Sequence, residues 1–197
     1  MSARGTHAAL LLLAVAIGAG ATACSRNGGP PRRPPLPSGQ AEAGGPRFLP
    51  PATIVDEPTA AAVAPATVVA LRTAAHEGFD RLTVELAGSS PGYRVAWRTT
   101  PPRHCGSGEP VKAAGPAWIE LRLDPAQAHD AEGRVSIAGG TEQPKLTALR
   151  SLELSCDFEA VVGWALGAPR TLPFRVMALS DPPRVVVDVA HAAHPSP

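Results

Sequence analysis

Two carboxylates near the end of the chain have the types and spacing that acid–base chemistry needs. Asp157 and Glu159 stand two residues apart in the stretch CDFEAVVGWALG, and paired acids can give and take the proton in a hydrolysis. They flank Phe158 in a strand pattern, so both are expected to point away from the apolar face. The same letters fit a tight connection and return strand, with Phe158 and Trp164 in the core. We therefore predict a hairpin here.

Two further motifs resemble catalytic or phosphate-binding loops. The stretch GSSPG matches the G-x-S-x-G nucleophile elbow at Ser90, but an elbow needs a helix after the serine. YRVAWR follows instead and alternates like a strand, so a hairpin connection explains the motif. HCGSGEPVK lacks the G-x-x-x-x-G-K-[ST] spacing of a phosphate loop. We expect no enzymatic activity.

Histidines and cysteines could supply zinc ligands. His104 is adjacent to Cys105, and His76 and Cys156 could join them, but this spacing fits no known finger pattern. The HAAH stretch near the C-terminus has a spacing that would matter only on a helix, and it ends a strand pattern. We therefore expect neither a metal nor a cofactor.

Composition limits the partners and the size of the folded part. The 197 residues carry a formal net charge of +1, so there is no bulk attraction to nucleic acid. The 19 glycines and 23 prolines are unevenly spread, which predicts extended segments beside one modest domain. Neither nucleic acid nor a small-molecule substrate is expected.

The N-terminus has the features of an export signal. A cationic start leads into an apolar run over residues 8–17, which is too short for a good transmembrane span. Residues 1–23 are therefore predicted to be a lipoprotein signal peptide, with Cys24 taking the lipid. Ala21 and Ala23 also form an A-x-A site for ordinary signal peptidase, which would give a secreted protein. The lipidated form would be anchored in the bacterial envelope, at the outer face of the cytoplasmic membrane or at the outer membrane.

A tether is predicted to follow the lipidated cysteine. Residues 24–66 are rich in Pro and Gly, with few aromatics and no sustained periodicity, so they cannot bury enough apolar surface to offset the entropy of ordering. We expect a disordered spacer that could reach about 120 Å if fully extended at ~3.1 Å per residue. Its PPRRPP stretch could instead bind a polyproline-recognising domain or a lipid surface.

The folded domain is predicted over residues 67–192, with a short tail over 193–197. Apolar residues alternate with polar ones in several short runs separated by Gly- and Pro-containing turns. Seven to nine strands with one apolar face each predict an all-β protein, a small antiparallel sandwich or a barrel. The residues expected to face the core are Leu82, Val84, Leu86, Tyr93, Val95, Trp97, Ile119, Leu121, Leu123, Leu152, Leu154, Cys156, Phe158, Val185, Val187 and Val189.

The three cysteines suggest one disulfide. If Cys24 carries the lipid, Cys105 and Cys156 remain to pair in an oxidising envelope. Closing a loop of about 50 residues would stabilise the domain by roughly 4 kcal/mol in the chain-entropy model. Buried free thiols and a metal site are the alternatives.

Four stretches together suggest a family. HEGFDRLTVEL, PGYRVAW, CDFEAVVGWALG and FRVMALSDPPRVVVDVAH occur in an order that resembles the AMIN-like domains of bacterial exported proteins and lipoproteins. The resemblance covers residues 76–191, and its most specific part is the last stretch. It implies a sandwich of two small sheets that serves as a non-catalytic module for localisation, as AMIN domains do by binding peptidoglycan.

Outward-facing arginines are the candidate ligand-binding residues. Bidentate contacts from guanidinium groups suit the carboxylates of peptide stems, although charged positions also keep a sheet face soluble. The candidates are Arg94, Arg98, Arg122 and Arg175.

The predicted function is a lipid-anchored envelope protein that binds peptidoglycan, and the alternative is a module that docks another envelope protein without a cell-wall ligand.

Overall fold

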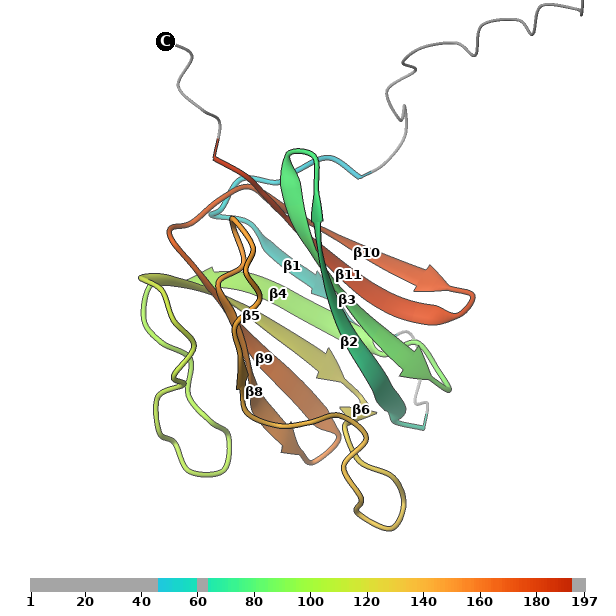
Figure 1. The fold of residues 1–197 in the computed structure, drawn as a ribbon. Coiled ribbons are helices and arrows are strands. Elements are labelled where there is room, and N and C mark those ends of the chain that lie inside the picture. The colour runs from blue at the N-terminus through green and yellow to red at the C-terminus, as the bar shows by residue number, and fades with distance from the viewer. Residues whose placement is uncertain (1–45, 60–63, 193–197) are drawn as a thin grey trace, which may run out of the picture. The chain divides into compact units, whose positions relative to one another are not determined.

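Within the described residues the protein is built from strands alone. The computed structural model describes residues 46–59 and 64–192, and these ranges contain eleven strands and no helix (Figure 1). Two sheets pack face to face, which confirms the predicted all-β sandwich. The predicted signal peptide, Cys24, most of the tether and the tail lie outside the described residues. In the same ranges no helix is long and apolar enough to cross a membrane.

One sheet has five strands in the order β10-β11-β3-β2-β6. All its neighbours are antiparallel except the two-residue pair of β2 with β6. Its strands are β2 (Ala66–His76), β3 (Phe79–Ala87), β6 (Ala126–Gln127), β10 (Phe174–Ser180) and β11 (Pro183–Ala190).

The other sheet has six strands in the order β1-β4-β5-β9-β8-β7, and all its neighbours are antiparallel. Its strands are β1 (Ile54–Glu57), β4 (Gly92–Arg98), β5 (Ala117–Asp124), β7 (Thr141–Glu142), β8 (Ser151–Phe158) and β9 (Val161–Ala168).

The core lies between the two sheets and follows the alternation in the sequence. Leu82 and Val84 of β3 and Ile119 and Leu121 of β5 are fully buried in one apolar cluster. Trp164 of β9 belongs to the same cluster, as predicted. Burying each such aliphatic side chain contributes roughly 1.5–3 kcal/mol to folding, so these alternating positions specify which face of each strand turns inward.

The stretch CDFEAVVGWALG forms the predicted hairpin. It joins β8 to β9 through Glu159 and Ala160, whose φ angles are +49° and +60°. Two successive positive φ angles define the turn whose twist matches that of paired strands. Glu159 therefore lies in the turn and not beside Asp157 on a strand face.

A bulge in β8 overturns the predicted faces of two residues, Cys156 and Phe158. Leu154 pairs with Trp164 but Cys156 pairs with Gly163, so one extra residue, Ser155, sits on the β8 side. An extra residue exchanges the two faces of everything beyond it. The prediction that Cys156 and Phe158 face the core with Leu154 is therefore wrong: Phe158 is 60% exposed.

The connection through Ser90 also differs from the prediction. β3 and β4 flank the GSSPG stretch but belong to different sheets, so the stretch carries the chain from one sheet to the other and is not a hairpin. As predicted, a strand and not a helix follows Ser90.

The ordered fold begins before residue 67. β1 (Ile54–Glu57) lies inside the predicted tether, yet it pairs with β4 at the end of the six-stranded sheet. Leu49 forms an isolated bridge with Phe174 at the edge of the other sheet. For residues 46–59, the prediction of disorder is therefore corrected.

Candidate binding cleft

A cleft of about 410 Å³ lies at the end of the six-stranded sheet where β1, β4 and β5 meet. The turn after β1 and the turn after β5 form its sides. It is lined by Asp56, Glu57, Pro58, Thr59, Gly92, Tyr93, Arg94, Arg122, Asp124 and Pro125.

Two of the four predicted arginines meet in this cleft. Arg94 of β4 and Arg122 of β5 are direct cross-strand partners, so their side chains leave the same outer face. Asp56, the β1 partner of Arg94, forms an ion pair with it. Arg122 has Gly163 on its other side, is exposed and forms no ion pair with any described residue. Neighbouring like charges, such as those of Arg94 and Arg122, lower the stability of a sheet. Of these two guanidinium groups, that of Arg122 is the one available to bind an anion.

Thr59 fixes one side of the cleft. Its hydroxyl donates a hydrogen bond to the carbonyl oxygen of Asp124 at 2.8 Å and accepts one from the amide of Gly92 at 2.6 Å. A Cβ on Gly92 would stand 2.6 Å from the backbone nitrogen of Thr59. Glycine is thus required for the turn after β1 to approach β4 this closely.

Tyr93 contributes a neutral hydrogen-bond donor. Burial, together with the nearby charge of Glu57, raises the pKa of the Tyr93 phenol above its ordinary value. The phenol therefore stays protonated well beyond neutral pH. The lining combines the guanidinium of Arg122 with the carboxylates of Glu57 and Asp124, so the cleft can bind a polar ligand that carries both a carboxylate and an ammonium group.

The other two predicted arginines lie elsewhere and have partners within the protein. Arg98, further along β4, pairs with Glu120 at 2.7 Å. Arg175 is on β10 of the other sheet, where its Nε donates to Asp188 at 2.7 Å. Its guanidinium also lies over the ring of Phe48. The structure thus brings together only half of the predicted set.

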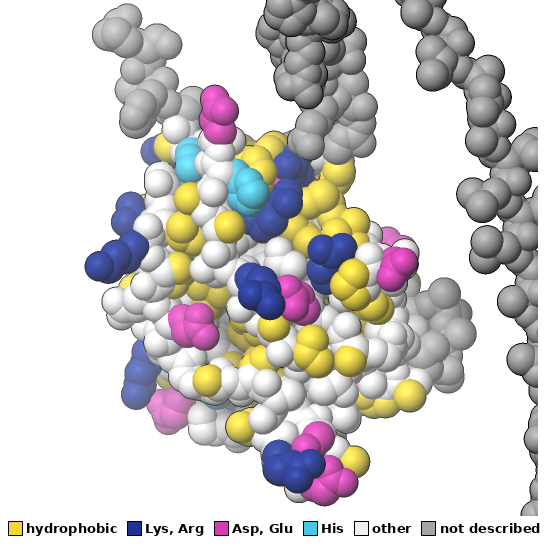
Figure 2. Space-filling model, turned by 45° about the vertical axis from the view of Figure 1, so that its right-hand side comes forward, with side chains coloured by type: hydrophobic (Ala, Val, Ile, Leu, Met, Phe, Trp, Pro, Cys, Tyr) yellow, Lys and Arg dark blue, Asp and Glu magenta, His cyan; other side chains and the backbone are white. Residues whose placement is uncertain are grey.

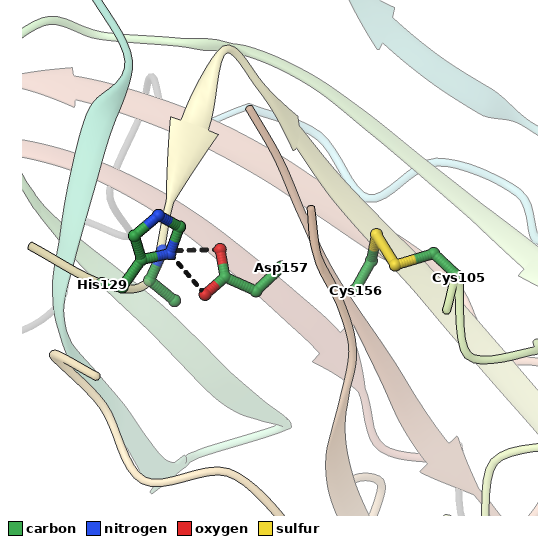
Figure 3. The surroundings of a disulfide bond; sticks show 5 residues. Cys105, His129, Cys156 and Asp157 are labelled. Atoms are coloured by element: carbon green, nitrogen blue, oxygen red, sulfur yellow. Dashed lines mark hydrogen bonds and ion pairs between the residues drawn. A yellow bond between two sulfur atoms is a disulfide. The ribbon is translucent and has the colours of Figure 1, made fainter. Parts of the chain in front are cut away.

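The predicted disulfide is formed, between Cys105 and Cys156 with their Cα atoms 5.2 Å apart. Figure 3 shows it beside Asp157, whose carboxylate accepts hydrogen bonds from the amide of Ala128 and from Nδ1 of His129. Asp157 thus secures the turn after β6. Among the residues described, no group of three or more His, Cys, Asp and Glu side chains is arranged to hold a metal ion.

The disulfide holds the long β4–β5 loop, residues 99–116, over part of the outer face of the six-stranded sheet. Val111 and Ala113 of the loop pack on Trp118 and Ala165 in a second apolar cluster. Buried Glu153 of β8 accepts hydrogen bonds from the amide of Lys112 at 2.7 Å and from His104 at 2.9 Å. The loop covers the β8–β9 side of this face, while the cleft opens at the β1–β4–β5 side.

Several cleft residues escaped the sequence analysis. Asp56, Glu57 and Thr59 belong to the segment predicted to be a tether, and no alternation marks a strand of four residues there. Asp124 is the last residue of β5, whose alternation is clear. Its position on the same face of the strand as Arg122 could therefore have been predicted. The alternation of β4 predicts Tyr93 in the core, but it is half-buried, packing against the core and lining the cleft.

These features define a class of protein: a two-sheet β module with a polar cleft at one end of one sheet. The AMIN-like domain family matches residues 66–191, so the chain belongs to that family. The family is a non-catalytic, binding-type domain that occurs in bacterial envelope-associated proteins. No curated protein and no solved structure matches the chain.

Proposed function

We propose that this protein is a lipid-anchored module of the bacterial envelope that binds peptidoglycan without transforming it. Membership of the AMIN-like family supports an envelope-associated binding role. The observation that carries the choice of site is the open guanidinium of Arg122 in a cleft that also holds Tyr93 and the carboxylates of Glu57 and Asp124. Peptide stems of the cell wall end in carboxylates and amines, which these groups complement.

The proposed site contains Arg94 and Arg122 and leaves out Arg98 and Arg175. Moving Arg98 or Arg175 onto a ligand would break the ion pairs with Glu120 and Asp188. Without Arg175, the buried carboxylate of Asp188 would lose one of its positively charged partners, and an uncompensated buried charge lowers the stability of the fold. Arg122 can bind a ligand without first breaking an ion pair with a described residue.

A sedimentation assay on purified sacculi tests the site. Replacing Arg122 by Ala should weaken binding about tenfold or more, because a hydrogen bond to a charged group contributes about 1.5–3 kcal/mol. Arg170→Ala is the matched control, since Arg170 is also an exposed arginine without an ion pair to the described residues but lies in the β9–β10 connection. Equal binding by the two variants would refute the site.

The same assay separates a cell-wall ligand from a protein ligand. Binding that soluble muropeptides displace supports peptidoglycan. Binding that disappears after proteinase treatment of the sacculi would instead identify an envelope protein as the partner. Release of soluble fragments by the protein would contradict a non-catalytic role.

The anchor is proposed at Cys24, and the sequence before it supports export and lipidation. Labelled palmitate should enter the wild-type protein and not Cys24→Ser. Secretion of an unlabelled wild-type protein would establish the alternative cleavage by ordinary signal peptidase.

A further inference from the structure

Within the described residues, one long side of the β10 backbone has no paired strand. β10 is the last strand of the five-stranded sheet and has β11 as its only neighbour in that part of the chain, apart from the single bridge between Leu49 and Phe174. Figure 2 turns toward the viewer the side of Figure 1 where β10 and β11 lie, and hydrophobic side chains are exposed there among charges of both signs.

The Leu49 bridge reveals which backbone groups point outward. Phe174 donates its amide to the carbonyl of Leu49 at 3.1 Å and accepts the amide of Leu49 at 2.6 Å. Because outward and inward groups alternate along an antiparallel strand, the amides and carbonyls of every second residue after Phe174 also point away from β11. These residues are Val176, Ala178 and Ser180.

The described chain before Leu49 does not cover these groups. The ring of Phe48 lies beside that of Phe79 on the outer face of the sheet, with centroids 6.0 Å apart. The carbonyl of Pro46 accepts a hydrogen bond from Arg175, and Arg175 also points to the outer face. The segment thus leaves the edge at Leu49 and crosses onto the face.

β10 also lacks the features that usually protect an edge strand. The edge strand β1 carries Asp56 and Glu57 among its four residues, and β6 and β7 have only two residues each. β10 has seven residues, and its only charge, Arg175, is near its start. An edge that is long and carries a single charge near one end is suited to pair with another strand.

We propose that β10 pairs antiparallel with β10 of a second copy of this chain, about a two-fold axis at Ala178. This pairing places Val176 opposite Ser180 of the second copy and Ala178 opposite its own equivalent. All three outward-facing residues of each copy then gain partners at once, and the Leu49 bridge stays intact. A two-fold pair of this kind is closed and self-complementary.

The side chains fit the same register. Met177 comes opposite Leu179 of the second copy, in the closer type of cross-strand pair. Leu179 is 40% exposed in the single chain, and the contact would cover it. Arg175 comes opposite the exposed Asp181 of the second copy, so the register places charges of opposite sign across from each other at both ends of the junction while Arg175 keeps its bond to Asp188. The inference is independent of the ligand in the cleft.

Cysteine cross-linking of the purified full chain tests the register. Ala178→Cys should form a disulfide-linked dimer under mild oxidation, because equivalent residues face each other across the axis. Ser180→Cys alone should not, since its equivalent lies four residues away along the partner strand, but mixing Ser180→Cys with Val176→Cys should give the linked pair. The unsubstituted chain measures any background from Cys24. Linking by Ser180→Cys alone, or none by Ala178→Cys, would overturn the register.

Sedimentation equilibrium tests the association itself. The unsubstituted chain should dimerise, and Leu179→Glu should weaken the dimer at least tenfold by placing carboxylates beside the apolar contact. Val69→Glu is the matched control, because Val69 is similarly exposed, at 46%, but lies on β2; it should leave the dimer unchanged. A monomer at every concentration, or a dimer that resists Leu179→Glu, would refute the proposal.

Discussion

Asp188 illustrates how one buried charge organises an otherwise exposed sheet face. It is fully buried, and its two oxygens accept hydrogen bonds from Arg81 at 2.6 and 2.9 Å and from Arg175 at 2.7 Å. Both guanidinium groups also lie over the ring of Phe79. The three charged residues and the ring join β10, β11 and β3 across their outer face.

Removing this carboxylate should destabilise the domain. Asp188→Ala leaves Arg81 and Arg175 facing each other without their shared counter-charge, and breaking a buried pair from one side costs about 3–5 kcal/mol. Urea unfolding should show a clearly lower midpoint. Glu85→Ala is the control, because Glu85 pairs on the same sheet with the exposed Arg72, and its midpoint should stay near that of the wild type. Equal midpoints for the two variants would contradict the role of Asp188.

Tyr93 provides a direct probe of the cleft because it is the only tyrosine in the chain. Burial and Glu57 raise its pKa, so ultraviolet titration of the phenol should give a midpoint above the ordinary value of 10.0. Glu57→Gln should move this midpoint down. Since the folded state favours the neutral phenol, its contribution to stability is present below the unfolded pKa and is lost as pH rises through the folded one. An unshifted midpoint in the native protein would contradict the burial of Tyr93.

At the scale of elements, the sequence predicted faces better than it predicted interruptions. Alternation placed Leu82, Ile119 and Val187 in the core correctly, because side-chain direction in a regular strand depends only on parity. The bulge at Ser155 cannot be recognised from the alternation of the sequence, because packing against other segments determines where an extra residue is inserted. The wrong faces of Cys156 and Phe158 follow from that single insertion.

The glycines of β9 depend on the β4–β5 loop in different ways. A Cβ on Gly167 would come within 2.1 Å of the carbonyl oxygen of Ala114, a backbone atom of the loop, whereas one on Gly163 would have the Ser155 hydroxyl, at 3.2 Å, as its nearest neighbour. Gly167→Ala should therefore displace the loop and cost about 1–3 kcal/mol. Gly163→Ala, on the same strand, should cost less, because its nearest contact is a side-chain hydroxyl that can rotate away. Thermal unfolding of both variants measures the difference, and a stable Gly167→Ala protein would show that the loop does not rest on β9.

At the scale of the whole molecule, the partition of strands between sheets was not predictable from local pattern. β3 and β4 are consecutive, yet they lie in different sheets, because that choice depends on contacts between distant segments. The candidate cleft has the same origin. The alternation of the sequence could place Arg94 and Arg122 on the outer face. Asp56 and Thr59, however, come from a segment that shows no strand pattern in its sequence and is ordered through the pairing of β1 with β4.

The disulfide acts on the whole domain because it closes a loop across 51 residues of sequence. Cross-linking of that span should contribute roughly 4 kcal/mol through the unfolded chain, out of the ~5–15 kcal/mol that stabilises a typical domain. The double variant Cys105→Ala/Cys156→Ala should therefore unfold at a much lower urea concentration. It should also free the β4–β5 loop, so amide exchange at Val111 and Ala113 should rise more than at Leu121 in the core. Unchanged unfolding together with unchanged exchange would show that packing on Trp118 alone holds the loop.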